Sequence, residues 1–286
     1  MEEEKTNKLK VAIQGYKGSF HDLAASNYFE NKELDLVCCS SFDELFDAVQ
    51  THKADVAIMA IENTVAGSLL PNYSLLNDAG FQIFGEIFLR IGQHLMVLPG
   101  QSMEEITEVY SHYMAIAQTR VFFKQYPHIR LIESEDTALS AKHIADNKLP
   151  GAAAIAGEAA ASEYGLNILF RNIETNKKNF TRFLALYKPN GSLRFMENAP
   201  EKASLSFSLP HTTGSLSQVL SIFSFYGISL TKIQSIPILG QEFQYHFLVD
   251  LSFEDADRYR QSVEAIRPLT EELNILGEYK RGQRII

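Results

Sequence analysis

Three short segments place polar side chains beside glycines or apolar runs in a way that could support chemistry. One is Asn179-Phe180-Thr181-Arg182-Phe183, where a hydroxyl precedes a guanidinium at the start of an apolar run. A guanidinium can hold a carboxylate through two hydrogen bonds, and a hydroxyl can donate to a leaving oxygen. The segment therefore suits an organic acid as substrate. The same residues also fit a plain strand edge with a surface arginine.

The second segment is Ile61–Ser68, which follows an apolar run at 54–61 that predicts a buried strand. It carries Glu62, Asn63, Thr64 and Ser68 around Gly67. Ligands of open α/β sheets bind at the carboxyl ends of strands, and so many polar groups exceed what a turn needs. We expect binding residues here.

The third segment is Gly15–Phe20, with Gly18 and Ser19, after a predicted strand at 10–14. Glycines at this place let a helix N-terminus approach an anion, but they also serve an ordinary turn, and both interpretations stay open. The spacing does not match the dinucleotide fingerprint. The eight histidines show no metal-ligand spacing, and Gly-x-Ser-x-Gly is absent, so the sequence predicts neither a metal site nor a serine nucleophile.

These segments need a scaffold, and the pattern of the chain indicates one. Strands alternate with amphipathic helices from residue 9 to 187, which predicts a mostly parallel sheet covered by helices on both faces. Residues 188–202 are rich in Pro, Asn and Gly and are typical of a linker. Residues 203–286 follow the order βαββαβ of a ferredoxin-like domain.

Composition excludes several classes of protein. The 286 residues are 45% hydrophobic and 21% charged, with a net charge of −9 and no basic stripe, which speaks against a nucleic-acid partner. No window is apolar enough to span a membrane, and the polar start lacks the apolar region of a signal peptide. Adjacent Cys38 and Cys39 suit free thiols in a reducing compartment. We expect a cytoplasmic protein.

Taken in chain order, the motifs resemble those of bacterial prephenate dehydratases, which have a catalytic domain followed by an ACT regulatory domain. Glu62-Asn63-Thr64-x-x-Gly67 is similar to the family's Glu-Asn-Ser-x-x-Gly, and Asn179-x-Thr181-Arg182-Phe183 stands at its most diagnostic motif. Gly214-Ser215-Leu216 resembles the Gly-Ala-Leu effector segment, and Gln234-Ser235-Ile236-Pro237 stands where Glu-Ser-Arg-Pro is usual. The resemblance covers roughly residues 9–280.

The resemblance implies an α/β fold: a two-lobed, periplasmic-binding-protein-like catalytic domain at 9–187 and a ferredoxin-like ACT domain at 203–286. It implies that prephenate loses water and carbon dioxide to give phenylpyruvate in phenylalanine biosynthesis, without a cofactor, under feedback by L-phenylalanine. The expected catalytic residues are Thr181, Arg182 and Phe183. Expected substrate-binding residues are Gly18, Ser19, Asn63, Thr64, Gly67, Ser68, Thr137 and Asn179. Expected effector-binding residues are Gly214, Ser215, Leu216, Gln234, Ser235 and Pro237.

The sequence departs from the family at a few positions. Asp136 stands where a serine is usual, and we expect it to cap the following helix. Gln234 and Ile236 remove two charges from the regulatory motif, which bears on effector affinity. Glu62 fits a structural role better than contact with a dianion.

Two other functions fit the same sequence. Arogenate could replace prephenate as substrate, and a two-lobed solute-binding or amino-acid-sensing protein could share the architecture without turnover. The absence of a secretion signal and the Thr-Arg-Phe motif favour an enzyme. ACT-type domains usually pair between chains, so we expect a homodimer or homotetramer.

Overall fold

The computed structural model describes residues 8–189, 199–238 and 240–286, which form two compact units. The first unit contains the described residues up to Ser68, together with Ile87–Phe183 and Arg284–Ile286. The second contains Leu69–Glu86 and the described residues of Leu184–Gln283. Most of the expected linker, residues 190–198, lies outside the described residues. The division at 188–202 stays a prediction.

The first unit consists of two α/β lobes. In the first lobe β1 pairs in parallel with β2 and with β3, and β11 lies beside β3. Its elements are β1 (Leu9–Gln14), α1 (Phe20–Tyr28), β2 (Leu34–Cys39), α2 (Phe42–Gln50), β3 (Val56–Asn63) and β4 (Gly67–Ser68). Two longer strands, β5 (Gln82–Arg90) and β11 (Phe180–Tyr187), each begin in one unit and end in the other.

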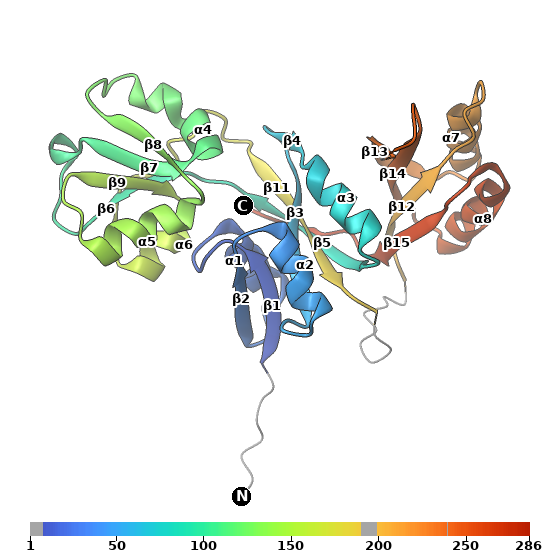
Figure 1. Ribbon diagram of the computed structural model, residues 1–286, viewed down its shortest axis with the longest axis horizontal. Coiled ribbons are helices and arrows are strands. Elements are labelled where there is room, and N and C mark those ends of the chain that lie inside the picture. Colours follow the sequence, from blue (N-terminus) through green and yellow to red (C-terminus); the bar gives the residue numbers. More distant parts are fainter. Residues whose placement is uncertain (1–7, 190–198, 239) are drawn as a thin grey trace, which may run out of the picture. The chain divides into compact units, whose positions relative to one another are not determined.

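The second lobe is a five-stranded sheet in the order β10-β6-β9-β7-β8, covered on both faces (Figure 1). Its elements are β6 (His94–Val97), η1 (Met103–Glu105), β7 (Glu108–His112), α4 (Tyr113–Phe123), β8 (Arg130–Ser134), α5 (Thr137–Asn147), β9 (Ala152–Ala156), α6 (Glu158–Tyr164) and β10 (Asn167–Phe170). On β9, Ile155 packs in a core with α4, while Ala154 and Ala156 pack in a core with α5 and α6. Because successive side chains alternate between faces, five consecutive small apolar residues can all be buried.

Side-chain caps fix where the helices begin. Ser19 accepts a hydrogen bond from the Asp22 backbone N–H at 3.3 Å, and Ser41 accepts one from Glu44 at 3.2 Å. Both caps have the Ser-x-x-acidic spacing that is typical of helix N-termini. Asp136 caps α5 as expected, because its Oδ1 accepts from the Leu139 N–H at 2.8 Å. Ser102 and Glu105 form a capping box of the same spacing, but it begins a single 3₁₀ turn, Met103–Glu105.

The second unit contains the predicted βαββαβ order. Its elements are α3 (Leu70–Asp78), β12 (Lys202–Ser208), α7 (Ser215–Phe225), β13 (Ser229–Pro237), β14 (Tyr245–Ser252), α8 (Ala256–Ile266), η2 (Arg267–Leu269), β15 (Asn274–Tyr279) and β16 (Gln283–Ile285), the last reaching the first unit. Strand order is β13-β14-β12-β15-β5. Leu205 and Phe207 pack with Val219 and Val263 of the two helices. Gly277 lets β15 approach β5, since a Cβ there would lie 2.1 Å from the Ile83 carbonyl oxygen.

Buried polar groups occupy the other face of β12. Lys202 Nζ lies 2.7 and 2.8 Å from the two carboxylate oxygens of Glu86 on β5, and both side chains are buried. Ser204 donates to Asp250 at 2.5 Å and hydrogen-bonds the Tyr279 hydroxyl at 2.7 Å. Glu86 also accepts from the Gly282 N–H at 3.1 Å. The charges of Lys202 and Glu86 are therefore paired within this unit.

Two expectations about the sheets need correction. The sheets are mixed, not mostly parallel, because β6 runs antiparallel to both β9 and β10. The short strands β4, β10 and β16 were not predicted. Two to four residues carry too weak a periodicity to be distinguished from loops. No helix in the described part of the chain is long and apolar enough to cross a membrane.

Replacing Lys202 by methionine should destabilise the second unit strongly, because it removes the ammonium that lies against both oxygens of the buried Glu86 carboxylate. Breaking a buried pair by removing one partner typically costs about 3–5 kcal/mol of unfolding free energy. The double variant Glu86→Gln with Lys202→Met should recover much of this loss. Urea unfolding followed by circular dichroism checks both, and a single variant as stable as the wild type would contradict the role of the pair.

Candidate active site

Asn63 lies at the end of β3, where the chain turns back through β4. Its side-chain oxygen accepts hydrogen bonds from the backbone N–H groups of Val65 and Ala66 at 2.9 and 2.8 Å. Only an oxygen can accept both bonds, so the turn fixes which way the amide faces. The amide nitrogen must then point toward β11.

That nitrogen makes two hydrogen bonds, to Asn179 Oδ1 at 2.8 Å and to Thr181 Oγ1 at 2.9 Å. Both amide protons of Asn63 are thereby used, so Asn63 holds its neighbours and has no donor left for a ligand. Thr181 is 8% exposed. Its oxygen accepts from Asn63, and its own proton has no acceptor among the described residues. The Thr181 hydroxyl is thus oriented as a hydrogen-bond donor.

Asn179 links this cluster to the second lobe. Its side-chain nitrogen donates to Gln118 Oε1 on α4 at 3.0 Å, and its backbone oxygen accepts from the Ile91 N–H at 2.8 Å. Asn179 is completely buried. A row of hydrogen-bonded amides therefore runs from Gln118 through Asn179 to Asn63, which in turn donates to the Thr181 hydroxyl.

Thr64 braces the same turn. Its hydroxyl accepts from the Phe180 N–H at 2.9 Å and donates to the Lys178 carbonyl at 3.1 Å. Gly67 has a φ of +84°, and it pairs with Asn63 across the β3–β4 ladder. Thr64 and Gly67 thus shape the turn that orients Asn63, and Ser68 follows them on β4.

The two crossovers between the lobes are bonded to each other. Arg90 Nη2 lies 3.1 Å from both Asn172 Oδ1 and Glu174 Oε1. The buried Glu174 carboxylate also accepts from the Gln93 N–H at 2.9 Å, and Gln93 accepts from the Ile173 N–H at 2.8 Å. These bonds connect residues 90–93 to residues 172–174, close in sequence to Asn179.

The loop after β1 forms a second contact between the lobes. Gly18 has a φ of +77°, and a Cβ there would lie 2.8 Å from Ala160 Cα on α6. Tyr164 donates its hydroxyl to the Lys17 carbonyl at 2.7 Å. Ser19 is buried as the cap of α1, and Thr137 is buried at the first turn of α5. Because a Cβ at position 18 would clash with Ala160, Gly18 is required for the close approach of this loop to α6.

Arg182 and Phe183 follow Thr181 on β11. Because side chains alternate along a strand, Phe183 shares a face with Thr181, and Arg182 lies on the opposite face. Both Arg182 and Phe183 are buried. The Arg182 side chain therefore lies on the face opposite the Thr181 hydroxyl, and its expected roles, binding a carboxylate or orienting the site, stay predictions.

His21 packs against Phe183 edge-to-face, with ring centroids 5.0 Å apart. Its Nε2 accepts a hydrogen bond from the Ala60 N–H at 3.2 Å. Burial lowers the pKa of His21 to about 3, so the ring is neutral near pH 7 and carries its proton on Nδ1.

Sequence reasoning missed both Gln118 and His21. Gln118 lies one turn from the buried Ala115 on α4, and a polar residue beside an apolar face is a weak signal. His21 was set aside because it had no metal-ligand spacing. Within the described ranges, no cluster of three or more His, Cys, Asp or Glu side chains could hold a metal ion.

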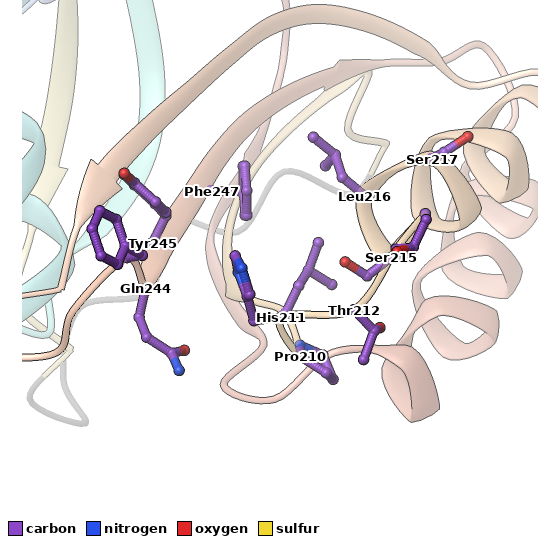
Figure 2. A pocket seen from close by; sticks show the side chains of 13 residues that line it. Pro210, His211, Thr212, Ser215, Leu216, Ser217, Gln244, Tyr245 and Phe247 are labelled. Carbon is purple, nitrogen blue, oxygen red and sulfur yellow. The ribbon is translucent and has the colours of Figure 1, made fainter.

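A separate pocket of about 520 Å³ lies within the second unit, between the loop before α7 and the start of β14 (Figure 2). Gly214, Ser215 and Leu216 line it from one side, and Tyr245 and Phe247 line it from the other. The expected residues Gln234, Ser235 and Pro237 lie on β13 and do not line this pocket. Ser235 pairs with Phe247 and Pro237 with Tyr245 across the ladder, which places them one strand away.

The sequence model of the prephenate dehydratase family matches residues 11–191. The chain belongs to the prephenate dehydratase family. The bifunctional chorismate mutase/prephenate dehydratase of Aquifex aeolicus is 34% identical over 96% of this chain and 74% of its own length. Arogenate dehydratase 5 of Arabidopsis thaliana is 36% identical over 95% of this chain and 67% of its own length.

Solved structures agree with this prephenate dehydratase fold. The Arthrobacter aurescens prephenate dehydratase in complex with L-Phe has a TM-score of 0.84 at 26% identity, covering 96% of this chain and 90% of that one. GqqA, named as a novel type of quorum quenching acylase, has a TM-score of 0.84 at 27% identity, covering 95% and 98%. Since one fold carries more than one named activity, the reaction must be argued from the site.

The structure brings together four of the residues expected for a prephenate dehydratase: Asn63, Thr64, Asn179 and Thr181. Gly18 and Ser19 lie in the other interlobe contact, and Thr137 lies at a helix start of the second lobe. The roles of all these residues toward a substrate stay predictions, as does the ACT assignment of the C-terminal part.

Acid should destabilise the first unit through His21. Its folded-state pKa of about 3 lies below the ordinary 6.5, so between these values the unfolded chain binds a proton that the folded chain does not. The free energy of unfolding therefore decreases as the pH is lowered from 6.5 toward 3, by roughly 1.4 kcal/mol per pH unit for one proton. His21→Gln should remove this contribution in urea titrations at pH 7, 6 and 5. His128→Gln, at an exposed site, is the control; equal slopes in both variants would contradict the prediction.

Proposed function

We propose that this protein converts prephenate to phenylpyruvate, with loss of water and carbon dioxide. One observation carries the proposal: the Thr181 oxygen is occupied by the Asn63 amide, so its O–H is left to donate to a ligand. Membership of the prephenate dehydratase family supports the same reaction.

The reaction needs few protein groups. The bond from the ring to its carboxylate breaks, and carbon dioxide leaves. That electron pair aromatises the ring and expels the C4 hydroxyl, which takes up a proton and leaves as water. Thr181 donates a hydrogen bond to the departing oxygen as negative charge develops on it. A neutral hydroxyl is a weak acid, so its effect comes from position and local field, and solvent supplies the proton.

The remaining residues divide between positioning and binding. Asn63, Asn179 and Thr64 hold Thr181 and the turn beside it. Arg182 orients the site from the other face of β11, and Phe183 packs on His21 on the same face as Thr181. For the substrate's carboxylates we propose the loop at Gly18 and Ser19 and the helix start at Thr137, with Gly67 and Ser68 at the β4 turn.

Arogenate is the second candidate substrate, because a curated relative at 36% identity is named an arogenate dehydratase. Arogenate carries an amino group where prephenate carries a ketone. Purified protein is given each compound, and phenylpyruvate in alkali or phenylalanine is measured. A third sample receives a compound with an N-acyl amide bond, because GqqA is named as an acylase. No turnover of prephenate or arogenate would overturn the proposal.

Thr181→Val should lower turnover by about two orders of magnitude or more, the size expected for a lost positioned donor. Thr181→Ser keeps the hydroxyl and should retain most of the activity. Thr119→Val is a matched control, because Thr119 is also buried but bonds only to its own helix at the Ala115 and Ile116 carbonyls. A folded Thr181→Val protein with wild-type turnover would remove Thr181 from the mechanism.

We further propose that the C-terminal part is an ACT domain and that L-phenylalanine binds in its pocket as an effector. The A. aurescens relative has L-Phe bound, and Gly214, Ser215 and Leu216 line the pocket here. Leu216 can contact the phenyl ring, while backbone groups at Gly214 can bind the polar end.

Leu216→Ala should weaken phenylalanine binding about tenfold, since it removes apolar contact area worth at least about 1.4 kcal/mol. Isothermal titration of L-phenylalanine into the wild type and the variant measures this, with L-alanine as a ligand lacking the ring. If L-phenylalanine does not bind the wild type at millimolar concentration, the effector proposal is wrong.

A second copy of the chain is the proposed partner of the C-terminal sheet. Strand β13 lies at its edge, and Ile233, Tyr245, Phe225 and Phe243 expose 42, 39, 82 and 74% of their surface. A strand at the edge of a sheet, together with exposed apolar side chains, favours pairing with another chain. Light scattering after size exclusion distinguishes monomer, dimer and tetramer.

A further inference from the structure

His21 contacts both strands that carry the central pair of the candidate site, β3 with Asn63 and β11 with Thr181. It lies in the first turn of α1, two residues after Ser19. Its Nε2 accepts from Ala60 on β3, three residues before Asn63, and its ring packs on Phe183 of β11, two residues after Thr181. We infer that His21 is a positioning residue of the reaction, which holds the strands bearing Asn63 and Thr181 in the register that orients the Thr181 hydroxyl.

His21 accepts the hydrogen bond of the Ala60 N–H just beyond the end of the ladder between β1 and β3. The ladder between β1 and β3 pairs Val11 to Ile13 with Val56 to Ile58, and Gly15 then turns the chain away with a φ of +97°. Ala60 lies two residues beyond the last pair. Ala60 is buried, and the bond to His21 fixes its backbone against the first turn of α1.

The ring also determines how β11 lies. Phe183 is buried and packs on His21, and His21 in turn contacts Phe42 at a centroid distance of 5.7 Å. Thr181 projects from the same face of β11 as Phe183. A movement of Phe183 would therefore displace Thr181 relative to Asn63, whose donated bond is 2.9 Å long.

The chemistry of the ring agrees with a positioning role. Nε2 is used as an acceptor, so it cannot bind a metal or take a proton without losing the Ala60 bond. The low pKa given by burial keeps the ring neutral. His21 thus acts through the strands, whereas Thr181 is the group that touches the substrate in the proposed reaction.

Three substitutions separate the hydrogen bond from the volume of the ring. His21→Phe keeps an aromatic ring but removes the acceptor. His21→Gln can place an oxygen near the position of Nε2. His21→Asn places its oxygen near the position of Nδ1, because its side chain is too short to reach Ala60. His128→Gln is the control at an exposed histidine.

We expect His21→Phe and His21→Asn to lower kcat by roughly ten- to a hundredfold, because a displacement of about 1 Å can cost that much. KM should stay within about threefold of the wild type, and His21→Gln should restore kcat to within about threefold. Wild-type kcat in His21→Phe or His21→Asn, or a His21→Gln protein as slow as His21→Asn, would overturn the inference. The comparison of His21→Gln with His21→Asn decides the question even if His21→Phe does not fold.

A double variant shows whether His21 acts through Thr181. In the Thr181→Val background, His21→Asn should lower kcat by no more than about twofold, because the hydroxyl it positions is absent. A loss equal to that in the wild-type background would mean that His21 only stabilises the fold, and would overturn the inference.

The inference rests on the proposed reaction, and two readouts keep their failures apart. Wild-type protein inactive on prephenate and arogenate refutes the proposed function alone. Hydrogen exchange of the peptide containing Ala60 is measured without substrate. The Ala60 backbone amide should exchange at least tenfold faster in His21→Asn than in His21→Gln. Equal protection of this amide in the two variants would overturn the positioning role.

Discussion

The candidate site depends on the orientation of one amide, that of Asn63. The turn after β3 presents two backbone N–H groups to its oxygen, and this leaves the nitrogen facing Asn179 and Thr181. A reversed amide would set its donors against the backbone donors of the turn and its acceptor against the Asn179 side-chain oxygen. The turn residues Thr64 and Gly67 therefore matter to the chemistry even though their own polar groups are used within the backbone.

The same amide row connects the lobes. Gln118 lies on α4 of the second lobe, and Asn179 lies where the chain returns to the first. The crossovers beside it are held by Arg90, Glu174 and the backbone of Gln93. Any change in the angle between the lobes must therefore alter hydrogen bonds within two residues of the candidate catalytic hydroxyl.

Local patterns in the sequence were sufficient to predict much of the fold. Helix starts at Ser19, Ser41 and Asp136 follow from caps that span three residues, and the βαββαβ order follows from periodicity. The family motifs located Asn63 and Thr181. The bonds that use every polar atom of Asn63, and the contacts of His21 and Gln118, join residues up to 118 positions apart, which one sequence does not display. The grouping of Leu69–Glu86 with the C-terminal unit is equally non-local.

The Thr-Arg-Phe motif can be understood as a property of a strand. Alternation gives Thr181 and Phe183 one face and Arg182 the other, so three adjacent residues reach two environments. On the first face Phe183 packs on His21, two positions from the hydroxyl that Asn63 orients. A guanidinium on that face would compete with Asn63 for the Thr181 oxygen, since it is also a donor. Placing Arg182 on the opposite face leaves the Asn63 bond intact and keeps the Thr181 proton available.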